Sequence, residues 1–291
     1  MRANQMPVAL AGTAALTLSA EIRRRFDEFS RSQKDVGQYI VDHLDETAFH
    51  TAEELARRAS TSSSTVVRFA QALGFEGFPQ LQTAARDEYR RSREQATPDV
   101  DQMMAPPLFP IDQTEFEAAL AADHTNVEDT ARKVDREEVA AAVDLIASSE
   151  RVLVCGADQM AFFASYLRHL LMLLDLRCEV VASPSQEGLA RLGRIDAATL
   201  VIGFSAGRPH PLVLRALKFA RHRGARTIAF ADATLSEVAR LADHRLYYSS
   251  NSPTFVRSHT ALLGMIQALA YAVYAKDEPA YAERIKAFRL K

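Results

Sequence analysis

The sequence has little cysteine, no long apolar run and no excess of positive charge, and each shortage excludes a class of protein. Cys155 and Cys178 are the two cysteines, and they lack metal-ligand spacing, so we predict inert strand residues in a reducing, cytoplasmic compartment and no metal site. No segment approaches the roughly 20 apolar residues that span a bilayer, which argues against a membrane partner. The formal net charge is −2, so binding to nucleic acid must depend on local basic patches.

The length and the composition predict two globular domains joined by a linker. At 291 residues, with 48% hydrophobic and 25% charged residues, the chain can bury two cores. Prolines interrupt any helix between Gln95 and Asp112. The Ala/Thr-rich start only faintly imitates a signal peptide, and we expect a disordered arm there. The predicted parts are an arm over 1–19, an all-α domain over 20–94, a linker over 95–114 and a second domain over 115–291 with its core at 130–277.

Residues 51–78 predict two short helices joined by a tight turn. Thr51 and Glu54 form a capping-box pattern at the start of the first helix. Ser62 can cap the second helix, which we expect to stop at Gly74. A preceding helix that starts at Ser30 has its apolar residues on one face, so the sequence predicts a three-helix cluster containing a helix-turn-helix.

The second of these helices has one apolar stripe, made by Val66, Phe69, Ala70 and Leu73. Arg and Gln on the opposite side can each make two hydrogen bonds to a base edge, and Ser can bond to several bases. The predicted DNA-binding residues, with the helix start entering the major groove, are Ser62, Ser63, Ser64, Thr65, Arg68 and Gln71. An ordinary surface helix has the same pattern.

Arginine clusters supply the local positive charge that a DNA interface needs. They lie at 23–25, 57–58 and 86–93, with Glu and Asp between them. We interpret Arg90 to Arg93 as a solvated helix face, and we assign phosphate contact to Arg57 and Arg58. We therefore expect each subunit to bind DNA with modest, salt-sensitive affinity. This expectation favours a homodimer or homotetramer that binds a pseudo-palindromic operator of double-stranded DNA.

The run Ser62-x-x-Thr65-Val66-Val67-Arg68-Phe69-Ala70-x-x-Leu73-Gly74-Phe75-x-Gly77-Phe78 resembles the N-terminal helix-turn-helix domain of the RpiR/MurR family of bacterial transcription factors. The resemblance covers about residues 20 to 90. Members of this family join the domain to a sugar isomerase (SIS) domain that senses a metabolite, commonly a phosphorylated sugar. The resemblance therefore implies a transcriptional regulator with an effector-binding second domain.

From Arg151 onward, short β-branched runs alternate with helical ones, which indicates a parallel sheet covered on both faces. The predicted strands are 151–155, 177–182, 199–204, 226–230 and 244–248. The predicted helices between and after them are 162–174, 186–192, 211–223, 235–242 and 255–274, and a helical stretch over 115–127 and 135–148 precedes them. The fold class is thus an α/β doubly wound, flavodoxin-like domain with a five-stranded parallel sheet. Its ligand site is expected beyond the carboxyl ends of the strands.

The loops at those strand ends are rich in small polar residues, which cradle anions at helix N-termini. We predict an effector site made of Gly156, Asp158, Ser183, Ser185, Ser205, Gly207, Arg208, Ser249 and Ser250. The same serines could act only as helix caps. No cofactor, metal or catalytic residue is predicted.

Residues 130–277 resemble a SIS domain, and the departures from its motifs bear on the ligand. SIS domains that hold sugar phosphates usually carry Gly-x-Gly-x-Ser after the first strand and Ser-x-Ser-Gly-x-Thr after the third. This chain has Gly156-x-Asp158-x-Met160 and Phe204-x-Ala206-Gly207-x-Pro209, so the hydroxyls are missing. Asp158 repels a phosphate dianion, whereas Arg208 can grip a carboxylate or a differently placed phosphate. Two alternatives follow. Either an acidic effector contacts Arg208, or Arg208 forms a structural salt bridge with Asp158 and no ligand binds.

Three functions compete. We favour a regulator of metabolic genes whose affinity for DNA changes when a small acidic metabolite binds. A sugar-phosphate isomerase is the second hypothesis, with Glu187 or His210 as the candidate acid–base groups. A regulator whose SIS domain only dimerises is the third.

Overall fold

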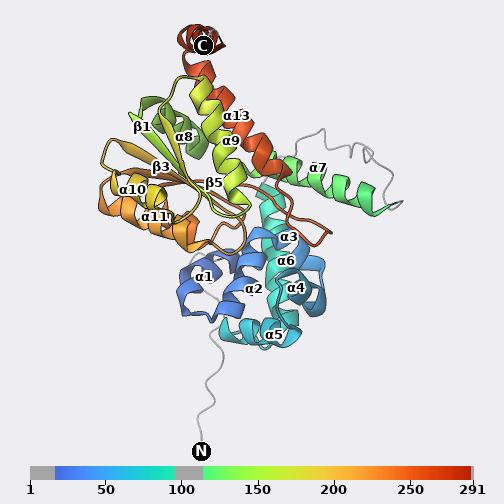
Figure 1. Cartoon of the computed structure of the whole chain (residues 1–291). Coiled ribbons are helices and arrows are strands. Elements are labelled where there is room, and N and C mark those ends of the chain that lie inside the picture. The colour runs from blue at the N-terminus through green and yellow to red at the C-terminus, as the bar shows by residue number, and fades with distance from the viewer. Residues whose placement is uncertain (1–16, 96–113, 290–291) are drawn as a thin grey trace, which may run out of the picture. The chain divides into compact units, whose positions relative to one another are not determined.

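The computed structural model describes residues 17–95 and 114–289. The chain divides into two compact units, Met1–Met103 and Met104–Lys291. Figure 1 labels the helices and strands of both. The predicted arm falls mostly on residues 1–16, and the predicted linker mostly on 96–113, which lie outside the described residues.

In the described part of the first unit, residues 17–95, the regular elements are helices. Its elements are α1 (Leu18–Arg25), a 3-10 turn (Phe26–Glu28), α2 (Arg31–Asp42), α3 (Leu44–Phe49), α4 (Ala52–Arg58), α5 (Ser63–Ala72) and α6 (Phe78–Gln95). The predicted three helices are α2, α4 and α5, and α1, α3 and α6 enlarge this cluster. Helix α1 begins two residues before the predicted start of the domain.

The core of this unit forms around Phe69 on α5. The ring of Phe69 packs edge-on against Phe29 at 4.9 Å between centroids. A Cβ on Gly37 of α2 would lie 3.0 Å from the Phe69 ring. Glycine at this position therefore lets α2 approach α5 closely, and Val36 and Ile40 of α2 are also completely buried here.

The second unit alternates helices and strands. Its elements are α7 (Glu115–Lys133), α8 (Arg136–Ser148), β1 (Arg151–Cys155), α9 (Met160–Leu173), β2 (Cys178–Val181), α10 (Gln186–Gly193), β3 (Thr199–Ser205), α11 (Pro211–His222), β4 (Arg226–Ala231), α12 (Glu237–Leu241), β5 (His244–Tyr247), α13 (Thr260–Lys276) and α14 (Glu278–Arg289). All five predicted strands are present.

The five strands form one parallel sheet in the order β2-β1-β3-β4-β5. Because the chain leaves β1 in one direction and then returns to add β3 on the other side, β1 and β3 mark the switch point of the sheet. This order confirms the predicted doubly wound fold. It also brings the carboxyl ends of all five strands to one edge.

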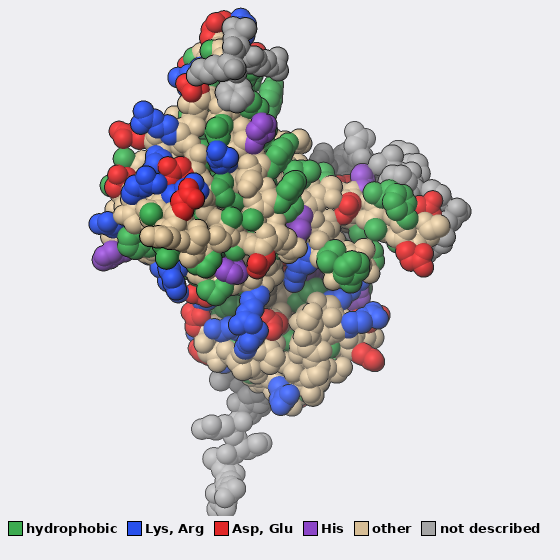
Figure 2. Space-filling model, in the orientation of Figure 1, with side chains coloured by type: hydrophobic (Ala, Val, Ile, Leu, Met, Phe, Trp, Pro, Cys, Tyr) green, Lys and Arg blue, Asp and Glu red, His purple; other side chains and the backbone are tan. Residues whose placement is uncertain are grey.

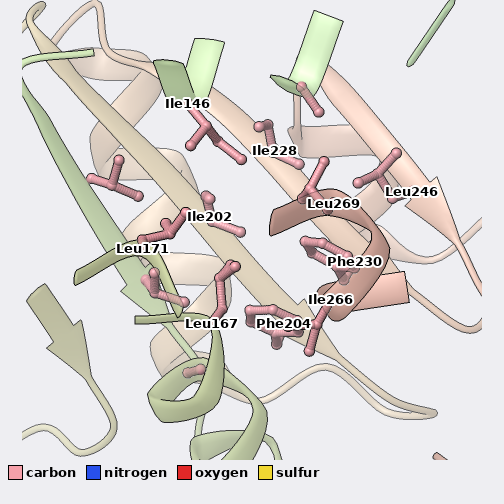
Figure 3. Packing of buried hydrophobic residues seen from close by; sticks show 14 of the residues in the cluster. Ile146, Leu167, Leu171, Ile202, Phe204, Ile228, Phe230, Leu246, Ile266 and Leu269 are labelled. Atoms are coloured by element: carbon pink, nitrogen blue, oxygen red, sulfur yellow. The ribbon is translucent and has the colours of Figure 1, made fainter. Parts of the chain in front are cut away.

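Both faces of the sheet carry apolar side chains, so helices pack against both faces. One face packs against α8, α9 and α13, and Figure 3 shows the side chains that meet there, among them Ile146, Leu167, Phe204, Phe230 and Ile266. The other face packs against α10, α11 and α12. Strand β3 is buried along its whole length, as expected for a central strand of such a sheet.

Helices α13 and α14 differ clearly from the predictions, and the bounds of α9 and α12 differ by one or two residues. Helix α13 begins at Thr260 rather than at Phe255, because tertiary hydrogen bonds hold the preceding segment in an irregular path. Helix α14, which the pattern analysis leaves unassigned, buries Tyr281 against the sheet domain. Within the described parts of the chain, no helix combines the length and the hydropathy of a membrane span.

Candidate DNA interface and effector site

The helix-turn-helix is built by local hydrogen bonds that the sequence predicts. At the start of α4, Thr51 N–H donates to Glu54 Oε2 (2.7 Å) and Glu54 N–H donates to Thr51 Oγ1 (3.2 Å). Ser60 takes a left-handed conformation (φ 53°) and turns the chain. Thr65 N–H then donates to the Ser62 hydroxyl (3.3 Å) and starts α5. These bonds fix the direction in which α5 leaves the turn.

Helix α5 separates a buried face from an exposed one as predicted. Val66, Phe69 and Ala70 are completely buried. The predicted DNA-binding residues on the exposed face are Ser62, Ser63, Ser64, Arg68 and Gln71. Thr65 lies apart from them, because it is 7% exposed and its hydroxyl contacts the Ser62 hydroxyl at 2.9 Å. Thr65 therefore stabilises the start of the helix rather than forming part of its outer face.

Val67, which was not among the predicted DNA-binding residues, also lies on this outer face. Val67 is 36% exposed and flanked on the helix surface by Ser64, Arg68 and Gln71. An exposed valine has no role in the core of the domain. In the major groove, however, an apolar side chain can contact the thymine methyl group. Its exposure on an otherwise polar face was visible in the sequence periodicity.

Several arginines of this unit form ion pairs with acidic side chains. Arg24 and Arg25 bond to Glu21 and Glu28, at 2.6 and 2.8 Å. Arg58 pairs with Glu46 at 3.1 Å. Across the described part of the unit, Arg57 has no ion pair and is exposed. On the face of the molecule shown in Figure 2, basic and acidic side chains are both present. Arg57 is thus better placed than Arg58 for a phosphate contact.

In the second unit, the predicted effector residues lie where the parallel strands end. Gly156 follows β1 and is buried, and a Cβ on it would lie 2.5 Å from the carbonyl oxygen of Met160. Only glycine therefore lets α9 start so close to β1. Asp158 is exposed and left-handed (φ 54°). Its carbonyl accepts from Ala161, and no side-chain cap is present at the start of α9.

The serines predicted for this site have different surroundings. Ser183 is exposed, and Ser185 caps α10 by accepting from Gly188 N–H at 3.1 Å. Ser249 is buried and donates to Asn126 Oδ1 of α7 at 2.9 Å. Ser205, at the end of β3, is 3% exposed, and its hydroxyl has no hydrogen-bond partner in the described parts of the chain. Ser185 and Ser249 therefore already have structural partners, whereas the Ser205 hydroxyl is a buried polar group without one.

A buried carboxylate that the sequence analysis missed lies beside the β3 loop. Asp232 directly follows β4, and its side chain is 2% exposed. Gly207 N–H donates to both of its oxygens (2.8 and 3.0 Å), and Ser250 donates to Oδ2 (2.9 Å). Arg257 forms an ion pair with Oδ2 at 3.1 Å. A polar residue immediately after a buried strand is the signal that could have identified Asp232.

His259, at the start of α13, is a second polar group at these strand ends. Its ring packs against Phe163 and Tyr248, with centroids 5.4 and 6.3 Å apart. Both ring nitrogens are buried and have no hydrogen-bond partner within the described chain. Burial lowers the pKa of His259 from its ordinary value of 6.5, with a smaller opposing effect from Asp232. The imidazole is therefore held in its neutral form.

Arg208 is exposed at the same edge of the sheet. No ion pair joins it to Asp158 among the residues that the structure describes, so the guanidinium remains available to a ligand. Of the two candidate acid–base groups, Glu187 pairs with Arg191 at 2.6 Å on α10. His210 accepts from Leu212 N–H at 3.1 Å and caps α11. Both groups therefore have structural partners.

Other features of the unit are apolar or unreactive. Burial raises the pKa of the Cys155 and Cys178 thiols to about 12, so both remain protonated. Two apolar hollows of 490 and 380 Å³ lie along α13, and neither is lined by a predicted effector residue. The described part of the chain holds no cluster of three His, Cys, Asp or Glu that could bind a metal ion.

Comparison with known proteins agrees with this arrangement. Residues 16–92 match the model of the helix-turn-helix domain of the rpiR family, and residues 145–272 match the SIS domain. The uncharacterized HTH-type transcriptional regulator YfhH of Escherichia coli K12 is 24% identical, with 91% of this chain and 94% of that protein covered. A similar regulator from Providencia stuartii is 22% identical over 82% and 83% of the two chains.

Two solved structures share the fold. The sugar isomerase domain of an RpiR transcription factor from Sphaerobacter thermophilus has a TM-score of 0.57 and 25% identity, and it covers 60% of this chain and 97% of that one. The Vibrio vulnificus NanR protein, solved in complex with ManNAc-6P, has a TM-score of 0.55 and 18% identity, with 94% and 97% covered.

Proposed function

This chain belongs to the RpiR family of helix-turn-helix transcriptional regulators with a SIS domain, and we propose that an acidic metabolite bound to its SIS domain changes its affinity for a specific operator. The DNA is a pseudo-palindromic site read by two copies of α5 in a homo-oligomer. The metabolite lies at the carboxyl ends of β1 and β3. Coupling requires that it favour one arrangement of the DNA-binding domains over another.

The outer face of α5 carries the DNA-binding part of this proposal. Arg68 and Gln71 are exposed and their side chains can each fork to a purine, while Ser63 and Ser64 lie at the helix start. The Nε of Arg68 donates to Ser64 O at 3.3 Å, which orients the guanidinium along the helix. Because each unit offers few phosphate contacts, a single copy is expected to bind weakly. Two copies on half-sites about 34 Å apart supply the affinity.

Arg208 carries the effector part. It is an exposed cation at the switch point of the sheet, without an ion pair in the described chain, and a carboxylate or phosphate is its natural ligand. NanR, a protein of the same fold, was solved with a phosphorylated sugar. The loops here lack the hydroxyls of the usual phosphate motif, so we place the effector's negative charge on Arg208.

We infer that this chain does not catalyse sugar-phosphate isomerisation. Glu187 and His210, the candidate acid–base groups, are engaged with Arg191 and with the α11 backbone. Turnover of aldose or ketose phosphates by the purified protein would contradict this inference. A third function, dimerisation alone, predicts that no small acid raises the thermal stability of the protein.

The first test is selection of DNA from a random library by the purified protein in moderate salt, with and without pooled acidic metabolites. An enriched inverted repeat whose recovery changes with the metabolites supports the whole proposal. Arg208→Ala should abolish the metabolite effect and leave the enriched motif unchanged. If no sequence is enriched under any condition, the regulator proposal fails and the isomerase hypothesis becomes the better one.

A further inference from the structure

The anion-binding loop after β3 is already filled by a side chain of the protein. Gly207 is left-handed (φ 56°), and its N–H lies between the end of a strand and the start of α11, a geometry that favours anions. The anion in this position is Asp232, which accepts from Gly207 N–H with both oxygens at 2.8 and 3.0 Å. The Ser250 hydroxyl adds a third hydrogen bond at 2.9 Å.

Arg257 covers this loop from outside. Its Nη1 lies 3.1 Å from Asp232 Oδ2 and donates to Ser250 Oγ at 3.3 Å. A Cβ on Gly207 would lie 3.1 Å from its Nε, so the guanidinium sits directly over the glycine. The Arg257 side chain is nevertheless 55% exposed, so part of it remains open to a ligand. The Asp232 carboxylate therefore lies between the Arg257 guanidinium, which is partly exposed to solvent, and the backbone of the loop after β3.

These contacts bear on which anion the site accepts. A phosphate dianion at Gly207 N–H would have to displace Asp232 or lie against its charge, and both are unfavourable. A carboxylate carries one charge and matches the fork of a guanidinium, so it can bind the exposed part of Arg257 without entering the loop. Ser205 Oγ is buried two residues before Gly207 and has no hydrogen-bond partner within the described residues, so it can donate to a ligand hydroxyl.

We propose that Asp232 determines the specificity of this site: it occupies the anion-binding loop as an internal carboxylate and excludes phosphate from it. Arg257, which lies over Gly207, and Arg208, the residue after Gly207, then hold a hydroxylated carboxylic acid together. This proposal rests on the proposed function in one respect, the location of the effector site. Asp232 contacts the ligand only through Arg257 and is a positioning residue.

The test measures anion binding without DNA, so it is independent of whether the protein regulates transcription. Thermal shift and calorimetry on the full-length protein would use inorganic phosphate and D-gluconate at constant ionic strength. We expect gluconate, and not phosphate, to stabilise the unmodified protein. Asp232→Asn keeps the size of the side chain and removes its charge, and should increase the affinity for phosphate about tenfold or more, since charge-assisted hydrogen bonds to the loop become available. Arg257→Met should abolish the gluconate effect.

The matched control is Glu237→Gln, which removes the carboxylate of the first residue of α12, where it pairs with Lys218. It should leave both anion responses unchanged. Phosphate binding to the unmodified protein, or no gain of phosphate binding in Asp232→Asn and in Asp232→Ser, would overturn the proposal. If Asp232→Asn gains affinity for phosphate but gluconate does not bind to the unmodified protein, the exclusion of phosphate by Asp232 is supported and the role of Arg257 is overturned. If neither variant folds, the phosphate titration of the unmodified protein still decides the exclusion.

Discussion

Replacing Asn126 by alanine should destabilise the SIS domain, because this side chain fastens α7 to the segment after β5. Asn126 is completely buried and makes three hydrogen bonds: it donates to Asn251 O (2.6 Å) and accepts from Ser249 Oγ (2.9 Å) and Asn251 N–H (3.0 Å). The Ser249 hydroxyl loses its acceptor in a buried site. Leaving a buried polar group unpaired costs about 1–3 kcal/mol, and the half-buried Asn251 groups can recover water, so we expect a loss of about 3 kcal/mol.

Calorimetry suits this measurement because the chain contains no tryptophan. For a domain of this size, about 3 kcal/mol corresponds to a fall in Tm of about 6–12 °C in the transition of the SIS domain. Ser249→Ala alone should cost about 1 kcal/mol, since Asn126 keeps its bonds to Asn251. Thr125→Ala, on the exposed side of the same helix, is the control and should change stability by less than about 0.5 kcal/mol.

A double-mutant cycle decides whether the shared hydrogen bond is responsible. Both single changes break the same Ser249–Asn126 bond. The loss of unfolding free energy in the double variant should therefore be smaller than the sum of the two single losses, by about 0.5 kcal/mol or more. A loss below about 1 kcal/mol for Asn126→Ala, or losses that add within experimental error, would refute this account of how α7 is held.

Three further predictions concern the outer face of α5 and the buried histidine. Arg68→Ala should weaken operator binding by about 1–3 kcal/mol and relax selectivity at one base pair, measured by titration of matched and mismatched operators, and unchanged selectivity would show that the recognition face is misplaced. Val67→Ala should remove a preference for thymine over uracil at one operator position, and a parent protein that ignores the uracil substitution would exclude the methyl contact. Since burial lowers the pKa of His259, the unfolded chain binds its proton first as pH falls below about 6.5, and stability is lost there. His259→Gln should lose less Tm than the parent between pH 7 and pH 5.5, and an equal loss would assign the effect to other groups.

Local patterns were sufficient to predict the elements of this fold. The limits of β1 agree with the prediction residue for residue, and the capping box of α4 forms as expected, because both depend on neighbours in the sequence. The start of α13 does not agree with the prediction. Asp123 and Asn126 of α7 accept hydrogen bonds from Ser258 and Asn251 in the segment before it. Contacts between residues more than a hundred positions apart leave no trace in the periodicity of the sequence.

The candidate site was predictable in its location and less so in its detail. Parallel strands bring their carboxyl ends together, so Gly207 and Arg208 could be placed at one edge from the alternation alone. Asp232 could not be recognised as the partner of Gly207, because that pairing depends on the register of β4 beside β3. Likewise, burial of Thr65 follows from its phase on α5 relative to Phe69 rather than from its hydroxyl chemistry.

The two buried cysteines have a practical consequence for spectroscopy of this protein. Thiols that remain protonated and out of solvent react slowly with maleimide or methanethiosulfonate reagents. A cysteine introduced at an exposed position, such as Arg90 on α6, would therefore take a fluorophore or spin label selectively without prior removal of Cys155 and Cys178. In a homo-oligomer, one such label per subunit would report the distance between the two DNA-binding domains directly, before and after an acid is added.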